Sequence, residues 1–292
     1  MTRELPRMEV LRTNDEMTKW REERYRKGQI VGFVPTMGYL HRGHLALMEE
    51  ALRRADEVVV SIFVNPTQFS PGEDLDQYPR DLEQDLKLCR DLGVQAIFAP
   101  EVEEMYPSGF QTRVQVEHIT QNLCGLHRTG HFSGVALVIT KLFGAIRPHL
   151  AVFGEKDFQQ LVVIKRLSKD LNLAGEIVAH PTVREPDGLA MSSRNKYLSE
   201  EERNSALSLS RSLLAARNMV AKGERRVDVL VARAKEMIEA EPHTRIQYVQ
   251  VVDEETVTDI DEVTPKAVMA MAVFVGQARL IDNMRLLPGE KP

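Results

Sequence analysis

The stretch "IVGFVPTMGYLHRGHLALMEEALRRADEVVVSIFVNP", residues 30–66, decides the fold. It opens with an apolar run, typical of a buried strand, that stops at Pro35. The segment 43–55 follows, with its apolar residues at helical spacing. A second apolar run covers residues 57–66 and ends in an Asn-Pro turn signal. Strand, helix and strand in this order predict a right-handed βαβ unit with two parallel strands.

The same alternation continues through the next hundred residues. The patterns predict a helix that ends at Gly93, a strand at 95–100, an apolar helix at 133–148 with Ser133 as N-cap, a strand, turn and helix over 149–171, and a strand at 174–181. We therefore expect a Rossmann-like, doubly wound parallel sheet in the α/β class.

The character of the chain changes after this region. Residues 182–198 form a polar loop, and "SEEE" at 199–202 is a capping box that opens a long helix. A second helix at 227–240 and strands at 245–253 and 267–276 follow. These patterns predict a Rossmann-like domain at 1–184 and a smaller C-terminal α+β domain at 185–292.

Composition narrows the class of protein. Of 292 residues, 43% are hydrophobic and 28% charged, which indicates a folded core, and the net charge of −5 argues against a general nucleic-acid or membrane surface. Cys89 and Cys124 form no metal-ligand cluster and suit a reducing compartment. The first residues have no signal-peptide pattern, and no apolar run is long enough to span a bilayer. We expect a cytoplasmic protein without nucleic-acid or membrane partners.

Five polar loops follow predicted strands or join the domains. They read "TMGYLHRGH", "NPTQF", "HRTGHFSG", "GEKDFQQ" and "MSSRN". Ligands of open parallel sheets bind beyond the carboxyl ends of the strands, so we expect these loops to form one site. His41 and His44, one turn apart at a helix start with free N–H groups, suit phosphate oxygens; the alternative is a solvated capping pair.

The other loops offer both charged and neutral side chains. Lys156 supplies a point charge, and Ser192, Ser193 and Arg194 supply hydroxyls and a guanidinium fork for a triphosphate. The alternatives are a surface salt bridge between Lys156 and Glu155 or Asp157, and an exposed linker at 192–194. The amides of Gln68 and Gln160 suit a substrate with hydroxyls and a carboxylate, or are exposed polar residues. Asn65 suits a turn.

Taken in order, six blocks resemble one family. "HRGH" and "AMSSRN" resemble the two signatures of the HxGH nucleotidyltransferase superfamily. "VPTMGYLHRGH", "SIFVNPTQF", "DLDQYPRDLEQD", "GHFSGV", "FGEKDFQQL" and "DGLAMSSRNKYL", with "RLIDN" near the end, resemble the pantoate–β-alanine ligases, or pantothenate synthetases. The resemblance implies ATP-dependent condensation of (R)-pantoate with β-alanine through pantoyl adenylate, in coenzyme A biosynthesis, by a homodimer that uses Mg²⁺ and closes its C-terminal domain as a lid.

The resemblance also implies residue roles. It makes His44, His41, Lys156 and Arg194 catalytic, and Gln68, Gln160 and Arg128 substrate-binding. It implies an ATP site formed by Met37, Gly38, Tyr39, Leu40, His41, Arg42, Gly43 and His44, by Gly154, Glu155, Lys156 and Asp157, and by Val183, Met191, Ser192, Ser193 and Arg194. No protein ligands for magnesium are identified, and phosphates and water can hold the ion.

The sequence departs from the family pattern in two places, and three other classes of protein are alternatives to this family. The family more often has an acidic residue near Cys124 and a proline at Thr129, and Arg42 fills the variable position of the histidine signature. A related nucleotidyltransferase would share the histidines without needing both glutamines. An aminoacyl-tRNA synthetase is disfavoured by the short, acidic chain. A non-catalytic nucleotide-binding regulator is disfavoured by the retained His44, Lys156 and Arg194.

Overall fold

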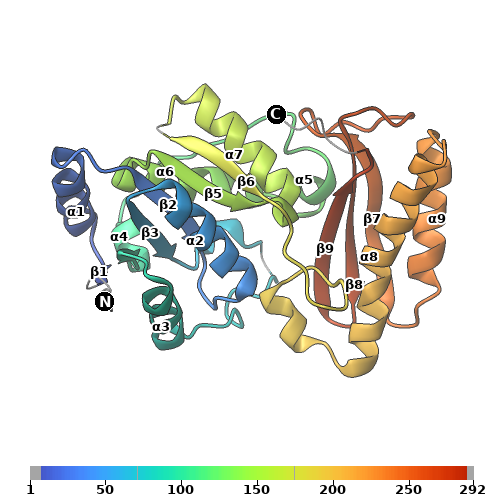
Figure 1. The fold of residues 1–292 in the computed structure, drawn as a ribbon, viewed down its shortest axis with the longest axis horizontal. Helices are drawn as coiled ribbons and strands as arrows, with labels where there is room; N and C mark the ends of the chain where they lie inside the picture. Colours follow the sequence, from blue (N-terminus) through green and yellow to red (C-terminus); the bar gives the residue numbers. More distant parts are fainter. Residues whose placement is uncertain (1–7, 71, 174, 288–292) are drawn as a thin grey trace. The chain divides into compact units, whose positions relative to one another are not determined.

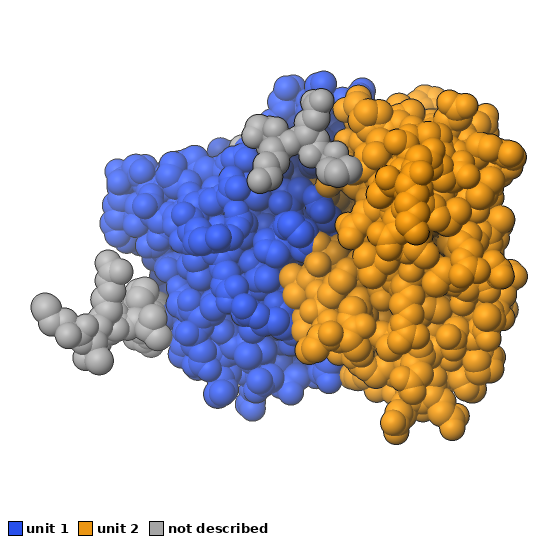
Figure 2. Space-filling model, turned by 45° about the vertical axis from the view of Figure 1, so that its right-hand side comes forward, with its two compact units in different colours: residues 1–116, 128–155, 163–181 blue, residues 117–127, 156–162, 182–292 orange. Residues whose placement is uncertain are grey.

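The computed structural model describes residues 8–70, 72–173 and 175–287. The chain forms two compact units, coloured separately in Figure 2. The first contains residues 1–116, 128–155 and 163–181, and the second contains 117–127, 156–162 and 182–292. Two short segments that precede residue 182, 117–127 and 156–162, therefore cluster with the C-terminal residues, and a single cut between 184 and 185 does not describe this division. That boundary stays a prediction.

The first unit is built on a six-stranded parallel sheet (Figure 1). The order is β1-β4-β3-β2-β5-β6, with bounds Glu9–Leu11, Ala96–Phe98, Glu57–Ile62, Val31–Thr36, Leu150–Gly154 and Glu176–His180. The chain proceeds outward from β2 through β3 and β4, then returns to the other side of β2 with β5 and β6. The point where the order reverses lies between β2 and β5, where open α/β sheets bind ligands beyond the carboxyl ends of the strands.

Helices cover both faces of this sheet. They are α1 (Asn14–Arg26), α2 (Arg42–Arg54), α3 (Leu82–Leu92), α4 (Val102–Met105), α6 (His131–Ile146) and α7 (Phe158–Asp170). Val34 of β2 shares a buried core with Met48 of α2 and Cys89 of α3. The next side chain along the strand, Phe33, meets Phe143 of α6 edge-on at 5.9 Å. Adjacent residues of β2 thus point into two different cores, which explains its uninterrupted apolar sequence.

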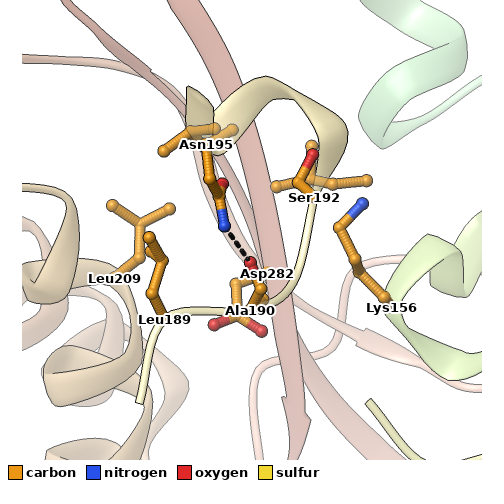
Figure 3. Close-up of a pocket in the computed structure, with 9 residues that line it drawn as sticks. Lys156, Leu189, Ala190, Ser192, Asn195, Leu209 and Asp282 are labelled. Carbon is orange, nitrogen blue, oxygen red and sulfur yellow. Dashed lines mark hydrogen bonds between the residues drawn. The ribbon is translucent and has the colours of Figure 1, made fainter. Parts of the chain in front are cut away.

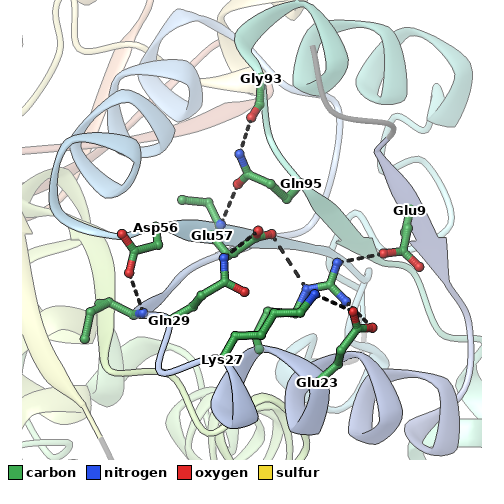
Figure 4. Close-up of polar contacts among 11 residues, drawn as sticks. Glu9, Glu23, Lys27, Gln29, Asp56, Glu57, Gly93 and Gln95 are labelled. Carbon is green, nitrogen blue, oxygen red and sulfur yellow. Dashed lines mark hydrogen bonds and ion pairs between the residues drawn. The ribbon is translucent and has the colours of Figure 1, made fainter. Parts of the chain in front are cut away.

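The sequence patterns did not predict β1 or α1. Helix α1 is mostly polar, so its apolar face is narrow, but Trp20 and Met17 are buried. Arg24 stacks on Trp20 at 4.2 Å and bonds Glu9 of β1 at 2.9 Å. It also lies 3.8 Å from Glu57 of β3, in the polar network of Figure 4. Side-chain contacts from distant segments, more than apolar periodicity, attach this helix to the sheet.

The second unit has a three-stranded antiparallel sheet, β7-β8-β9, with bounds Thr244–Asp253, Ala267–Val275 and Ala278–Arg285. Two long helices, α8 (Glu200–Ala221) and α9 (Val227–Glu239), pack against it (Figure 1). Ser199 and Glu202 form the predicted capping box at the start of α8. The short helix α5 (Leu123–His127) also belongs to this unit. The predicted fold class, a Rossmann-like parallel sheet with a smaller C-terminal α+β part, is confirmed.

Two local predictions are wrong. The apolar helix begins at His131, and its N-cap is Gly130 with φ 82°, so Ser133 lies inside the first turn and caps nothing. The second strand ends at Ile62 instead of continuing to Pro66, because Pro66 begins the 3₁₀ turn η1 (Pro66–Gln68). In residues 8–70, 72–173 and 175–287, none of the helices combines the length and apolar character that crossing a bilayer requires.

Candidate active site

His41 and His44 stand at the start of α2, in the first unit. His41 is the N-cap residue, and its Nδ1 accepts a hydrogen bond from the backbone N–H of Gly43 at 3.1 Å. The Nδ1 of His44 accepts from the backbone N–H of His41 at 3.3 Å, and the ring centroids lie 4.1 Å apart. A neutral imidazole that accepts at Nδ1 carries its proton at Nε2. The capping and anion-binding interpretations are therefore compatible, because they use different ring nitrogens.

The backbone N–H groups of the loop before α2 are already hydrogen-bonded within the first unit. Gly38 donates to Thr36 Oγ1 at 3.1 Å. Tyr39 and Leu40 donate to the two carboxylate oxygens of Asp85 at 2.8 and 2.7 Å. The expectation of free N–H groups at this helix start is wrong for His41 and Gly43, whose N–H groups the two imidazoles accept. What the histidine loop offers an anion is its imidazole donors.

Arg42 occupies the variable position of the histidine signature. Its guanidinium points along the surface of α2 and pairs with Glu49 at 2.5 and 3.2 Å, with 56% of the side chain exposed. A side chain with its own solvent-exposed partner imposes little on the loop.

Gln68 is the last residue of η1 and is buried. Its Oε1 accepts from Asn65 Nδ2 at 3.0 Å, and its Nε2 contacts Met37 Sδ at 3.2 Å. Asn65 is 1% exposed and is fixed in turn by the hydroxyl of Tyr106 at 2.8 Å. Asn65 is thus more than the turn former that its sequence context predicted. It fixes the amide orientation of Gln68, so that Nε2 is the end left to donate.

Arg128 joins a buried polar chain next to Gln68. Its Nε and Nη2 donate to the two oxygens of Glu73, each at 2.7 Å. Burial acts to raise the pKa of Glu73, but the Arg128 hydrogen bonds and charge outweigh it and lower that pKa. Arg128 Nη1 lies 2.9 Å from His131 Nε2, and His131 Nδ1 lies 2.8 Å from the Gln68 carbonyl oxygen. Since a guanidinium can only donate, His131 accepts at Nε2 and donates from Nδ1. The sequence did not single out His131 or Glu73.

Lys156 lies in the 3₁₀ turn η2 (Glu155–Asp157) that directly follows Gly154 at the end of β5, and it belongs to the second unit. Its Nζ is 3.6 Å from Asp157, which is the salt bridge weighed as an alternative, and its side chain is 20% exposed. Asn283 of β9 donates to the Lys156 carbonyl at 3.0 Å. The "RLIDN" block thus orients the backbone that carries the lysine.

A small pocket of the second unit brings Lys156 and Ser192 together with Asn195 and Asp282 (Figure 3). Ser192 is the N-cap of η3 (Ser193–Tyr197), and its Oγ accepts from the N–H of Arg194 at 3.3 Å. Asn195 donates to the Ala190 carbonyl at 3.0 Å, the dashed contact in Figure 3. The predicted lysine and serine therefore line one cavity.

The loop that carries Met191 to Arg194 is held by ionic contacts. Arg184 binds Asp282 through two hydrogen bonds of 2.7 and 2.9 Å and also donates to the Gly188 carbonyl at 3.1 Å. The Val183 carbonyl accepts from the N–H of Met191 at 2.9 Å. These contacts join the start of the loop to β9 and close the segment 183–191 on itself.

Gln160 lies half-buried in α7 and belongs to the second unit, whereas Gln68 belongs to the first. Its neighbour Gln159 is 4% exposed and donates to the carbonyls of Ile119 and Asn122 at 2.9 and 2.8 Å. Of these two consecutive glutamines, Gln159 is therefore the one whose amide holds the backbone of another segment. The described residues contain no group of three or more His, Cys, Asp or Glu side chains that could hold a metal ion.

Comparisons with known proteins identify the family. The model of the family described as pantoate-beta-alanine ligase matches residues 9–285. The chain belongs to this family. The pantothenate synthetase of Syntrophobacter fumaroxidans is 53% identical over 281 residues, which cover 96% of this chain and 99% of that one. The enzyme of Pelotomaculum thermopropionicum is 53% identical over 276 residues, 94% and 98% of the two chains. Family membership makes this chain a carbon–nitrogen ligase.

Solved structures of the family share the whole fold. The pantothenate synthetase of Thermus thermophilus superposes with a TM-score of 0.92 at 48% identity, covering 96% of this chain and 100% of that one. The ligase of Francisella tularensis, solved as a complex with beta-gamma ATP and β-alanine, gives 0.79 at 32% identity, covering 97% and 99%.

The structure shows the local contacts of Cys124 and Thr129, the two positions of the loop that departs from the family pattern. The sulfur of Cys124 lies 3.2 Å from the Tyr248 hydroxyl and accepts from Arg279 at 3.3 Å, so the thiol occupies the place of an acceptor for that arginine. Burial, with the neighbouring thiol, raises the pKa of Tyr248 well above its ordinary value. The Thr129 carbonyl accepts from the Ser70 hydroxyl at 3.2 Å. Neither departure disturbs Arg128, which keeps its bonds to Glu73.

Proposed function

We propose that this ligase joins pantoate to β-alanine in two steps. A carboxylate oxygen of (R)-pantoate attacks the α-phosphorus of ATP, the bond to the bridging oxygen breaks, and pyrophosphate leaves. The amine of β-alanine then attacks the acyl carbon of pantoyl adenylate and loses a proton. The acyl carbon–oxygen bond breaks and AMP leaves, so the products are pantothenate, AMP and pyrophosphate. Family membership and the ATP and β-alanine of the Francisella complex support this assignment.

The observation that carries the proposed chemistry is the donor geometry of His41 and His44. Both Nδ1 atoms accept backbone N–H groups, so both Nε2 atoms present N–H donors at the start of α2. Donors fixed before reaction stabilise negative charge that grows on phosphate oxygens, and they need no reorganisation. We assign His44 as the catalytic histidine and His41 as its partner on the phosphates. The loop from Met37 to Gly43 contacts ATP beside them.

Gln68 and Gln160 are assigned to pantoate. Asn65 takes the Oε1 of Gln68, so the amide offers its N–H to the substrate, and the matching group is a carboxylate or hydroxyl oxygen. We propose that Arg128 supports the pantoate site indirectly and does not bind the substrate as a free cation. Its charge is balanced by Glu73, so we assign it to holding His131 and the Gln68 backbone.

Lys156 and the loop from Met191 to Arg194 are assigned to the nucleotide phosphates, with Gly154 to Asp157 at the ribose and Val183 at adenine. An ammonium beside the Ser192 hydroxyl offers charge and hydrogen bonds to an oxyanion. Mg²⁺ enters with ATP as part of the substrate, because its preferred oxygen ligands are available on phosphates and water. We also propose that the protein acts in the cytoplasm as a homodimer.

The decisive experiment is ATP–pyrophosphate exchange with and without pantoate. Adenylate formation predicts exchange that requires pantoate, and release of AMP when β-alanine is added. Exchange that proceeds with a phosphate ester in place of pantoate would identify a different nucleotidyltransferase. ATP binding without exchange under any of these conditions would identify a non-catalytic regulator. Sedimentation equilibrium tests the dimer separately.

A further inference from the structure

A carboxylate behind the histidine loop has no assigned role in the reaction. Asp85 lies in the first turn of α3, and 2% of it is exposed. Its Oδ2 accepts from the N–H of Tyr39 at 2.8 Å and its Oδ1 from the N–H of Leu40 at 2.7 Å. Asp85 thus uses both carboxylate oxygens to bind two consecutive N–H groups, which lie more than forty positions earlier in the chain.

The loop has the backbone conformation that requires such a partner. Gly38 and Tyr39 have positive φ values of 81° and 52°, and Tyr39 is a bulky residue in a region that favours glycine. Successive residues of this kind turn their N–H groups into one concave face, which binds anions. In this protein the anion is the chain's own Asp85. Without it, two partly buried N–H groups would lose these partners, and Tyr39 would lose a contact that maintains its conformation.

The contact is too close to be incidental. A Cβ atom built on Gly38 would lie 2.9 Å from Asp85 Oδ2, so only glycine lets the carboxylate approach the next two N–H groups. Leu40 directly precedes His41, whose own N–H is the donor to His44. A rotation of the peptide groups at 39 and 40 therefore moves the N-cap residue and, through its hydrogen bond, the second imidazole.

We propose that Asp85 is a positioning residue that sets the direction of the His41 and His44 donors. The inference rests on the proposed function, because it concerns the same adenylation step. Asp85 touches neither substrate, and it acts through the backbone of Tyr39 and Leu40.

The principal variant is Asp85→Asn, which keeps the shape but turns an amide N–H₂ toward one of the two donors. Pantoate-dependent ATP–pyrophosphate exchange should fall about 10- to 100-fold, the range for a displacement of about 1 Å in a catalytic group. Pantoate affinity, measured by calorimetry, should stay within about two-fold, because Gln68 is held by Asn65. The matched control is Asp81→Ala, which removes the N-cap of the same helix and leaves the loop contacts in place. It should lower thermal stability while exchange by the folded protein stays within about three-fold.

A spectroscopic measurement tests the same point without turnover. Long-range ¹H–¹⁵N spectra of the histidine rings should report Nε2–H tautomers for His41 and His44 in the unaltered chain and a changed pattern in Asp85→Asn. Should this variant not fold, Asp85→Glu keeps the charge and displaces it by one methylene. It should slow exchange about 10-fold with a thermal midpoint near that of the unaltered chain.

The outcomes separate the inference from the function on which it rests. If the unaltered chain shows no pantoate-dependent exchange, the proposed function fails. If it does show exchange and folded Asp85→Asn matches it within about two-fold, Asp85 has no positioning role. Recovery of exchange at raised Mg²⁺ would instead make Asp85 a metal ligand. An equal loss of pantoate affinity would mean that the variant disturbs the whole unit.

Discussion

Gly134 provides the most direct structural test of the substrate side of the site. It lies in the second turn of α6, which packs against η1, the turn that carries Gln68. A Cβ atom built on Gly134 would lie 2.2 Å from the Thr67 carbonyl oxygen and 2.6 Å from the Gln68 nitrogen. Ordinary contacts begin near 3.4 Å, so Gly134→Ala must separate the helix from the turn by about 1 Å. Both groups are backbone, and a rotamer change cannot relieve the contact.

The expected magnitude follows from this displacement. Overpacking of this kind destabilises a protein by about 1–3 kcal/mol, and an error of about 1 Å in a binding group costs up to about 100-fold in rate. Gly134→Ala should therefore raise the pantoate KM of the exchange reaction or lower kcat/KM by about 10- to 100-fold, with the ATP KM nearly unchanged. Gly144→Ala in the same helix is the control, because nothing lies within 4 Å of its added Cβ. This variant should unfold with a free energy up to about 1 kcal/mol higher than that of the unaltered chain. Wild-type pantoate kinetics in Gly134→Ala would refute the assignment of Gln68 to pantoate.

Three further predictions concern both units. His44→Ala should lower adenylate formation by about 10² to 10⁴ while circular dichroism stays unchanged, and near-normal turnover would remove His44 from the mechanism. Lys156→Ala should slow adenylation far more than attack of β-alanine on preformed pantoyl adenylate, and equal losses in single-turnover assays of the two steps would contradict its phosphate role. Arg184→Met should lower the free energy of unfolding by about 3–5 kcal/mol, because it removes the counter-ion of Asp282, whose side chain is 2% exposed. Asp282→Asn should lower the free energy of unfolding by less, because the Arg184 side chain that it leaves unpaired is 25% exposed. Equal losses of the two variants in urea unfolding would contradict this difference.

The sequence predicts the parallel sheet because local and long-range requirements agree there. The run at 30–35 contains no polar side chain, as suits a strand between two helix layers, and the helix after it has a single apolar face. Gly93 ends α3 with φ 88°, as the sequence indicated. By contrast, β9 reads ARLIDNMR, with no regular alternation of polar and apolar residues, so its sequence signal is weak. Its Asp282 and Asn283 bond Arg184 and the Lys156 carbonyl instead.

The candidate site is less predictable from sequence, because its fixed orientations come from contacts between distant segments. The loop at 36–44 identifies two histidines, but nothing in it specifies Asp85 as the partner of its N–H groups. The sequence around Asn65 indicates only a turn, and the fold alone reveals that Tyr106 and Gly134 surround it. The boundary between the two units falls inside the "GEKD" motif, between Glu155 and Lys156. The local sequence does not reveal this boundary, because its pattern indicates only a strand, a turn and a helix.

One arrangement recurs among the residues assigned to the substrates. Backbone N–H groups occupy the Nδ1 atoms of His41 and His44, and Asn65 occupies the Oε1 of Gln68. In each case the acceptor end of a two-ended polar group is used inside the protein, and the role at the substrate is assigned to the donor end, which in Gln68 also contacts Met37 Sδ at 3.2 Å. A set of donors suits carboxylate, hydroxyl and phosphate oxygens, and it leaves a substrate ammonium without a partner. We therefore propose that these residues of the first unit hold the anionic reactants of adenylation and do not hold the β-alanine amine, which under the proposed function reacts only after pyrophosphate has left.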